Sequence, residues 1–148
     1  MPTNARKFFS KEQQGAILLA IKNAELDSGG EIRVHLETNC PGNALDRAAY
    51  LFKKLKMHKT KLRNSVLFYL AVENRKFATI GDVGINAVVP DQFWEEIKMH
   101  LLMRFRESKF TEGLCEAIEM TGQQLKKLFP YQKDDVNELP DELSFGPE

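Results

Sequence analysis

The segment Ser65–Val72 limits most strictly what this chain can fold into. It reads Ser-Val-Leu-Phe-Tyr-Leu-Ala-Val, so its side chains are apolar at both sets of alternate positions. Strands that are buried on both faces have this pattern. The run is far too short to cross a bilayer, which takes roughly 20 residues. It therefore predicts a central strand of a soluble domain, with other elements covering both of its faces.

Two further strands are predicted on either side of this one in the sequence. The polar turn Glu73–Lys76 is followed by the apolar stretch Phe77–Ile80, which indicates an antiparallel hairpin. Earlier in the chain, Glu31–Glu37 alternates strictly between polar and apolar residues. This alternation is typical of a strand with one buried face, and we expect it near an edge of the sheet.

Helical signals separate these strands. A capping box at Ser10 and Gln13 opens a first helix that should stop before Gly29, and a second apolar stripe runs from Leu45 to Leu55. After the glycine-containing break at 81–84, one short helical turn is expected over 85–89. Two long helices then follow, one opened by Pro90 and Asp91 and one capped by Thr111.

These elements predict an α/β fold. A helix joins the first two strands, so they should be parallel, and the third strand is antiparallel to the second. Helices on both faces give a three-layer α/β/α sandwich around a small mixed sheet. We expect one domain over residues 1–148, with an acidic tail from about residue 131 whose apolar residues pack back on the domain.

Charge and targeting signals exclude several classes of function. Lys plus Arg and Asp plus Glu both number 21, and this zero net charge argues against a nucleic-acid binder. The N-terminal charges are not followed by a long apolar run, so we expect a cytoplasmic protein without a membrane span. There the two cysteines, Cys40 and Cys115, should be reduced, and neither belongs to a CxxC pair.

The familiar catalytic motifs do not fit this sequence. A cysteine phosphatase needs five residues between its Cys and Arg, but Arg47 lies one position too far from Cys40, and Asp46 would repel phosphate. We therefore predict that Cys40 is not a nucleophile. The basic run from Lys53 to Arg63 could hold phosphate or an acidic partner, but it more commonly marks the solvated end of a helix.

At this point the sequence resembles the TPM-domain family. The resemblance covers most of the chain, from about Ala16 to Leu128, and rests on the order and spacing of several short pieces. Those pieces are Gly30-Glu31-Ile32, Asn64-Ser65-Val66-Leu67, Glu73-Asn74-Arg75-Lys76, Gly81-Asp82-Val83-Gly84 and Phe110-Thr111-Glu112-Gly113-Leu114.

The resemblance carries functional implications. The family includes a thylakoid-lumen acid phosphatase that takes part in photosystem II repair, bacterial proteins of unknown role and an animal membrane protein that modulates receptors. Some members bind calcium. Many relatives carry a signal peptide and a membrane anchor, and we expect neither in this chain. It also reads Gly81-Asp-Val-Gly-Ile-Asn86 where relatives usually have Gly-Tyr-Gly-Leu-Glu.

An acidic constellation at one end of the sheet is the candidate site. Because the third strand is antiparallel, its end at Asp82 should lie beside the starts of the other two strands, near Glu31 and Asn64. Gly81 and Gly84 allow main-chain carbonyls to turn inward, and Asn86 or Asp91 could add further oxygens. Calcium takes six to eight oxygen ligands of this mixed kind. The sequence predicts a calcium site here, with magnesium as the second choice.

Alternatives remain open at this stage. A rival cluster at the opposite end of the sheet comprises Glu37, Asn39, Asp46, Glu73 and Asn74. If the chain is an enzyme, we expect weak metal-assisted phosphomonoester hydrolysis, with Arg63 neutralising the phosphate. The alternative is a non-catalytic protein-interaction module. In either case we expect a monomer.

Overall fold

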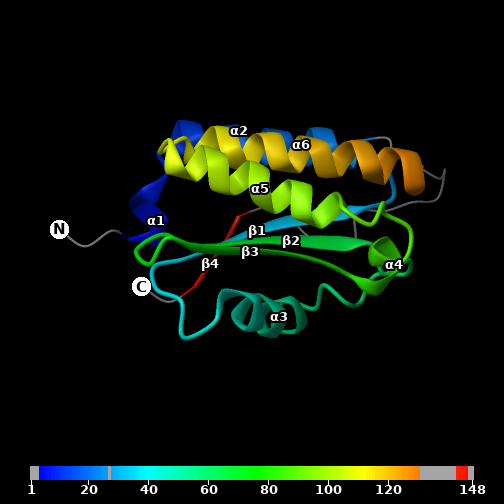
Figure 1. Ribbon diagram of the computed structural model, residues 1–148, viewed down its shortest axis with the longest axis horizontal. Helices are drawn as coiled ribbons and strands as arrows, with labels where there is room; N and C mark the ends of the chain where they lie inside the picture. The colour runs from blue at the N-terminus through cyan, green and yellow to red at the C-terminus, as the bar shows by residue number, and fades with distance from the viewer. Residues whose placement is uncertain (1–3, 27, 131–142, 147–148) are drawn as a thin grey trace.

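A mixed sheet forms the middle layer of the molecule (Figure 1). The computed structural model describes residues 4–26, 28–130 and 143–146. Within these residues the sheet has four strands in the order β3-β2-β1-β4. Their bounds are β1 Glu31–Glu37, β2 Ser65–Ala71, β3 Lys76–Gly81 and β4 Ser144–Phe145.

The strand directions agree with the prediction. β1 pairs with β2 in parallel, from Glu31 opposite Ser65 to Glu37 opposite Ala71. β2 pairs with β3 in antiparallel fashion, with Val66 opposite Gly81. β2 is buried along its whole length, as its apolar pattern on both faces requires. The short β4, which the sequence did not predict, pairs in parallel with β1.

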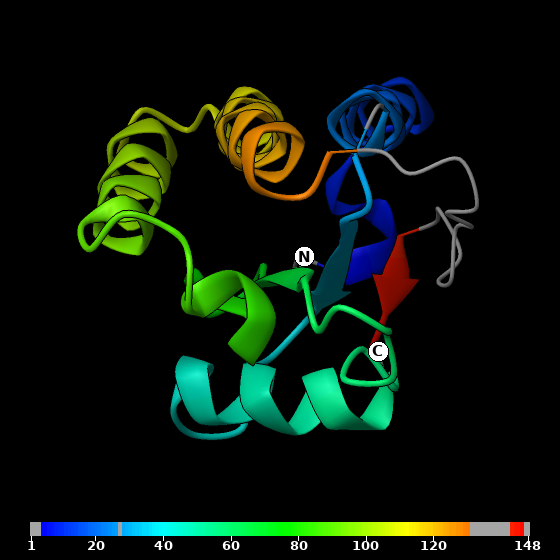
Figure 2. The ribbon, with the colours of Figure 1, turned by 90° about the vertical axis from the view of Figure 1, so that its right-hand side faces the viewer.

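Helices cover the two faces unequally (Figures 1 and 2). The three long helices α2, α5 and α6 lie on one face, and α3 lies on the other. The bounds are α1 Ala5–Phe8, α2 Lys11–Glu25, α3 Ala44–Lys54, α4 Val83–Asn86, α5 Phe93–Arg106 and α6 Phe110–Leu128. This arrangement confirms the predicted α/β sandwich.

Each face of the sheet has its own core. On the three-helix face, the even-numbered residues of β1 and β2 pack against α2, α5 and α6. On the other face, Leu67, Tyr69 and Ala71 of β2 pack against Ala48 and Phe52 of α3. The apolar residues that alternate along β1 thus face the larger of the two cores, as their pattern predicted.

The polar face of β1 differs from the prediction. We expected it to be exposed, but all seven residues of β1 are buried. Glu31, Arg33, His35 and Glu37 face the α3 side of the sheet, where helix α3 and strand β4 lie close by. Polar residues in alternation therefore mark a second, polar interior here, and not a solvent-facing surface.

Two helix starts also differ. α5 begins at Phe93, because Pro90 and Asp91 belong to the preceding turn. α6 begins at Phe110, after Lys109, so Thr111 lies inside the helix and does not cap it. The capping box at Ser10 and Gln13 is present as predicted.

The end of the chain is described only in part. Leu143 is buried in the larger core, and Phe145 packs against it. The other apolar tail residues that we expected to pack back, Val136 and Leu139, lie outside the described residues. In the described part of the chain, no helix combines the length and the apolar character that a membrane crossing requires.

Candidate functional site

Glu31 and Asp82 lie on opposite sides of Ser65 at one end of the sheet. Glu31 pairs with Ser65 across the β1–β2 boundary, and the Asp82 N–H donates to the Ser65 carbonyl at 2.9 Å. All three residues are buried. The two acidic residues are thus two strand spacings apart, roughly 10 Å between Cα atoms. The predicted approach of Asp82 to this end of β1 and β2 is correct.

The Asp82 carboxylate already holds a cationic partner. Arg63 donates from Nε to Oδ2 at 2.7 Å and from Nη2 to Oδ1 at 2.8 Å. Oδ1 also accepts the Val83 N–H at 2.8 Å, so Asp82 caps α4. The carboxylate raises the pKa of the Arg63 guanidinium through these hydrogen bonds. Sequence reasoning assigned Arg63 to a phosphate and missed this ion pair.

The three amide and carboxylate residues predicted beside them occupy different positions. Asn64 is buried next to Ser65 and donates from Nδ2 to the Gly29 carbonyl at 3.1 Å, which leaves its Oδ1 as an acceptor. Asn86 donates to the Gly81 carbonyl and accepts from Trp94. Asp91 is exposed in the turn before α5.

The glycines of the break have a steric role. A Cβ on Gly84 would lie 2.0 Å from the Leu62 carbonyl oxygen, so α4 can approach the loop before β2 only because this residue is glycine. The Gly84 N–H donates to the Arg63 carbonyl at 2.8 Å. We expected the carbonyls of the break to turn toward an ion, whereas that of Gly81 accepts the Asn86 amide.

Charged side chains alone do not form a metal centre here. Over residues 4–26, 28–130 and 143–146, no group of three or more His, Cys, Asp or Glu side chains is arranged to hold a metal ion. A cation at the Glu31–Asp82 end would therefore need amide and main-chain oxygens in addition to two carboxylates. Calcium accepts such mixed oxygen ligands.

The opposite end of the sheet contains a buried ion network that the sequence indicated only in part. Glu37 is bound by the Arg47 guanidinium through Nε and Nη2, and Tyr69 donates its hydroxyl to Oε2 at 2.6 Å. Burial acts to raise the pKa of Glu37. The hydrogen bonds from Arg47 and Tyr69 act in the opposite direction and outweigh burial, so the pKa of Glu37 is lowered overall. Burial, followed by the bond to Glu37, raises the pKa of Tyr69.

His35 extends this network toward β4. Its Nε2 lies 3.6 Å from Glu37 Oε1, and its Nδ1 lies 2.7 Å from the Ser144 hydroxyl. Burial lowers the pKa of His35, although Glu37 opposes the shift. The signal that could have revealed this network is the pair of opposite charges at Glu37 and Arg47, where β1 ends and α3 begins.

The rival cluster is only partly assembled. Asn74 accepts the Cys40 N–H at 2.5 Å and donates to Asn39 at 3.4 Å, so the turns after β1 and β2 are joined. Arg47, which the Cys40 hypothesis would have needed for phosphate, is bound to Glu37. Arg47 is therefore engaged by another group, and the statement that Cys40 is not a nucleophile stays a prediction.

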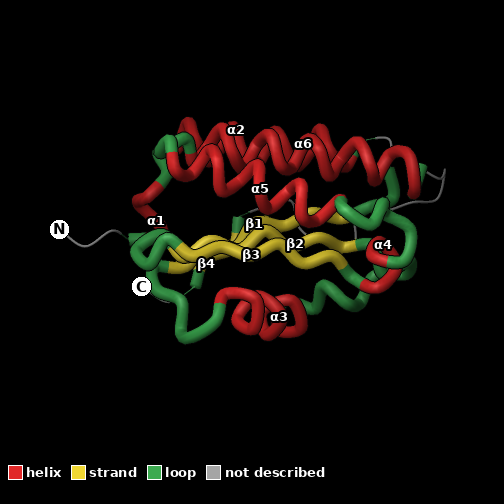
Figure 3. Tube along the Cα trace, viewed as in Figure 1, coloured by secondary structure: helices red, strands yellow, loops and turns green. Residues whose placement is uncertain are grey.

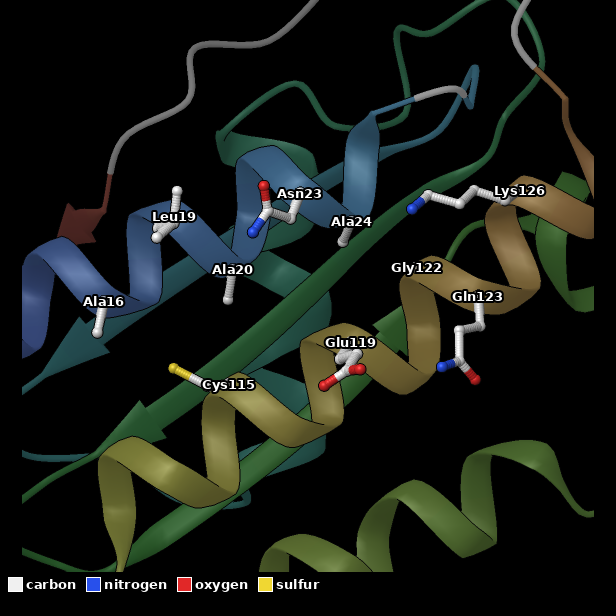
Figure 4. Close-up of a pocket in the computed structure, with 10 residues that line it drawn as sticks. All are labelled: Ala16, Leu19, Ala20, Asn23, Ala24, Cys115, Glu119, Gly122, Gln123 and Lys126. Carbon is white, nitrogen blue, oxygen red and sulfur yellow. The ribbon is translucent and has the colours of Figure 1, made fainter.

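A groove between α2 and α6 is lined by small residues and by the polar residues Asn23, Glu119, Gln123 and Lys126. It encloses about 450 Å³, and its walls include Ala16, Ala20 and Ala24 of α2 and Cys115 and Gly122 of α6 (Figure 4). Burial raises the pKa of the Cys115 thiol, which keeps it protonated and unreactive. The Glu31–Asp82 end is not part of this groove. It lies near α4, at the end of the sheet where β1 and β2 begin and β3 ends (Figure 3).

Comparisons with known proteins agree on one family. The profile of the TPM domain matches residues 3–124. The chain is similar to the BA42 protein of the psychrophilic bacterium Bizionia argentinensis, with 45% identity and a TM-score of 0.87. That alignment covers 95% of this chain and 97% of the other. No curated protein matches the chain.

Two more distant structures share the fold. The N-terminal domain of a protein from P. gingivalis has 20% identity and a TM-score of 0.67, over 85% of this chain and 83% of that one. The N-terminal domain of a protein from Corynebacterium glutamicum has 12% identity and a TM-score of 0.62, over 91% and 79%. At these identities the likeness concerns the fold alone.

Proposed function

The chain belongs to the TPM-domain family, and from that premise we propose that it binds a divalent cation, calcium before magnesium, at the Glu31–Asp82 end of the sheet. The observation that carries the proposal is the position of these two buried acidic residues on either side of Ser65. Two carboxylates at one end of a sheet repel each other when ionised, and a cation near both would relieve that repulsion.

The remaining ligands would be neutral oxygens. Asn64 adjoins Ser65 and keeps its side-chain oxygen as an acceptor. The main-chain carbonyls of Gly81, Asp82 and Val83 accept hydrogen bonds from Asn86 and Ala87, so one of them would have to exchange that donor for the cation. The proposed set also includes Asn86, whose side-chain oxygen accepts from Trp94, and Asp91, which is exposed in the turn before α5. Calcium suits such an irregular shell better than magnesium, which requires near-octahedral geometry and gives up its water reluctantly.

Binding would require a change of partner at Asp82. Arg63 occupies both carboxylate oxygens, but its own side chain is 44% exposed and can rotate into solvent. We infer that the incoming cation takes the place of the guanidinium. The divalent cation would then replace the guanidinium beside Asp82, so the buried carboxylate always has a positively charged partner.

This exchange suggests how a weak phosphomonoesterase activity could arise. A bound cation would polarise a phosphoryl oxygen and position the attacking water. The released Arg63 would be free to neutralise a second phosphate oxygen, since guanidinium groups match phosphate geometry. The alternative is a non-catalytic interaction module, in which Arg63 stays on Asp82.

A thermal-shift series with calcium, magnesium and EDTA tests the proposal. A ligand that binds only the folded state raises the melting temperature by mass action, so calcium should raise it and EDTA should reverse the rise. Hydrolysis of p-nitrophenyl phosphate in the same buffers tests the activity. An unchanged melting temperature at millimolar calcium would refute the cation site, and cation binding without hydrolysis would favour the non-catalytic alternative.

A further inference from the structure

The sheet has an open edge at β3. Among the described residues, β3 is the outermost strand on that side, and it pairs with β2 along its inner edge. Because the Asp82 N–H donates to Ser65, residues 82, 80 and 78 direct their main-chain groups toward β2. The main-chain N–H and C=O groups of Phe77, Thr79 and Gly81 therefore point away from the sheet.

Side chains already occupy the two ends of this edge. Asn86 donates to the outward Gly81 carbonyl at 2.7 Å and is itself held by Trp94 at 2.8 Å. At the start of the strand, Lys76 donates to the Gly42 carbonyl at 3.0 Å. Between these ends, the main-chain groups of Phe77 and Thr79 have no hydrogen-bond partner among residues 4–26, 28–130 and 143–146.

A groove of about 350 Å³ runs along this open stretch. Its floor is formed by Phe77 and Thr79, one wall by Leu45 at the start of α3, and the other by Trp94 and Lys98 of α5. The two helices lie on opposite sides of β3 (Figure 1). The edge of β3 therefore lies in a groove that both helices border.

Three side chains in the groove also lack polar partners among the described residues. The Thr79 hydroxyl is buried without a hydrogen bond in the described structure. Glu95 and Lys98 line the α5 wall, and neither forms an ion pair with a described residue. On the α3 wall, Leu45 is 57% exposed although it begins the apolar stripe of its helix.

We propose that this groove binds an extended peptide segment of another protein, which adds to the sheet as a strand beside β3. The main-chain groups of Phe77 and Thr79 supply hydrogen bonds that do not depend on the peptide's sequence, as in other cases of strand addition. The peptide's side chains alternate between the two walls. Those facing α3 contact Leu45 and are apolar, and those facing α5 are polar, with an acidic group at Lys98.

Panning a phage library of linear decapeptides against the whole chain tests this inference. Selected peptides should alternate apolar and polar residues, and each is then synthesised for calorimetry. Thr79→Pro removes one outward N–H, and proline is tolerated on a sheet edge where no ladder bond is lost. This variant should weaken binding about tenfold, the effect of losing roughly one hydrogen bond.

A second set of probes does not depend on how the variant folds. N-methylation of alternate peptide residues blocks main-chain hydrogen bonding in one frame only, so one frame should abolish binding and the other should preserve it. Lys98→Glu should select basic peptides in place of acidic ones. The proposal is overturned if no peptide is selected, if both N-methyl frames bind equally, or if β3 instead pairs with a second copy of the chain in a dimer that Thr79→Pro dissociates.

Discussion

Arg63 and Asp82 form a two-pronged ion pair that ties the loop before β2 to the end of β3. The guanidinium contacts both carboxylate oxygens, at 2.7 and 2.8 Å, while Asp82 also caps α4. Arg63 adopts a left-handed backbone with φ 52, which L-residues rarely take. The backbone conformation of the loop and the ion pair therefore reinforce each other, and any ion that binds Asp82 must compete with this arrangement.

The first prediction concerns the charge of Asp82. Asp82→Asn keeps the shape of the side chain and its cap on α4 but removes a formal charge, so calcium affinity should fall by about tenfold or more. Calorimetry at fixed ionic strength measures this directly. Equal affinity in the wild type and the variant would show that calcium, if it binds, binds elsewhere.

The second prediction separates a structural ion pair from a cation site. Arg63→Gln removes the competitor for Asp82, so the protein without calcium should melt at a lower temperature while its calcium affinity rises. Opposite effects of this kind are expected when the ion and the guanidinium compete for the same carboxylate. Thermal melts with and without calcium measure both quantities, and parallel decreases in stability and affinity would contradict the exchange.

The sheet could be predicted from the sequence because its signals are local. The apolar pattern of Ser65–Val72 and the alternation of Glu31–Glu37 fix which residues face the cores, and the polar turn after Val72 fixes the hairpin. The approach of Asp82 to Ser65 follows from antiparallel pairing alone. For this reason the end of the sheet that carries the predicted site was assembled correctly.

The contacts that control the site depend on positions remote in sequence. Alternation alone does not show that the polar side of β1 is buried, since its partners Arg47 and Ser144 come from α3 and from the far end of the chain. Nor does it show that Arg63 turns toward Asp82, because that requires the left-handed conformation of one loop residue. The sequence misplaced the starts of α5 and α6, which lie at Phe93 and Phe110. Near a helix boundary, residues such as Pro90 and Thr111 are compatible with more than one position in the cap or the first turn.

The third prediction concerns the buried carboxylate at the other end of the sheet. Tyr69→Phe removes the hydroxyl that donates to Glu37 and should cost about 1–2 kcal/mol of stability at pH 7, since the acceptor is charged and buried. The pKa of Glu37 is lowered in the folded state, so its contribution is present above pH 4.5 and is lost as the pH falls further. The loss below pH 4.5 should be smaller in Tyr69→Phe than in the wild type, because the pKa of Glu37 is lowered less without the hydroxyl, and urea melts from pH 7 to pH 3 measure this difference.

The fourth prediction concerns His35. Burial lowers its pKa below the ordinary 6.5, against the opposing effect of Glu37 and with smaller contributions from Arg47 and Arg33. The unfolded state therefore binds the proton more readily, and the contribution of His35 to stability is lost as the pH falls below 6.5. His35→Gln should flatten the pH dependence of unfolding just below pH 6.5. An unchanged slope in the variant would show that another group controls this range.

The last prediction compares two glycines in helices. A Cβ at Gly84 would lie 2.0 Å from the Leu62 carbonyl oxygen and 2.6 Å from that of Arg63, so Gly84→Ala must push α4 away from the loop. Displacing backbone atoms costs about 1–3 kcal/mol, as overpacking generally does. Gly15 in α2 is the matched control, because its Cβ would meet nothing within 4 Å. There alanine should stabilise the protein by about 0.5–1 kcal/mol, since glycine is a poor helix former.

Because Gly84 also fixes the Arg63 carbonyl, Gly84→Ala should disturb Arg63 and change calcium affinity, whereas Gly15→Ala should leave it unchanged. Urea melts and calorimetry on both variants measure these effects. If Gly84→Ala and Gly15→Ala had equal free energies of unfolding, α4 would be free to shift without consequence for the site.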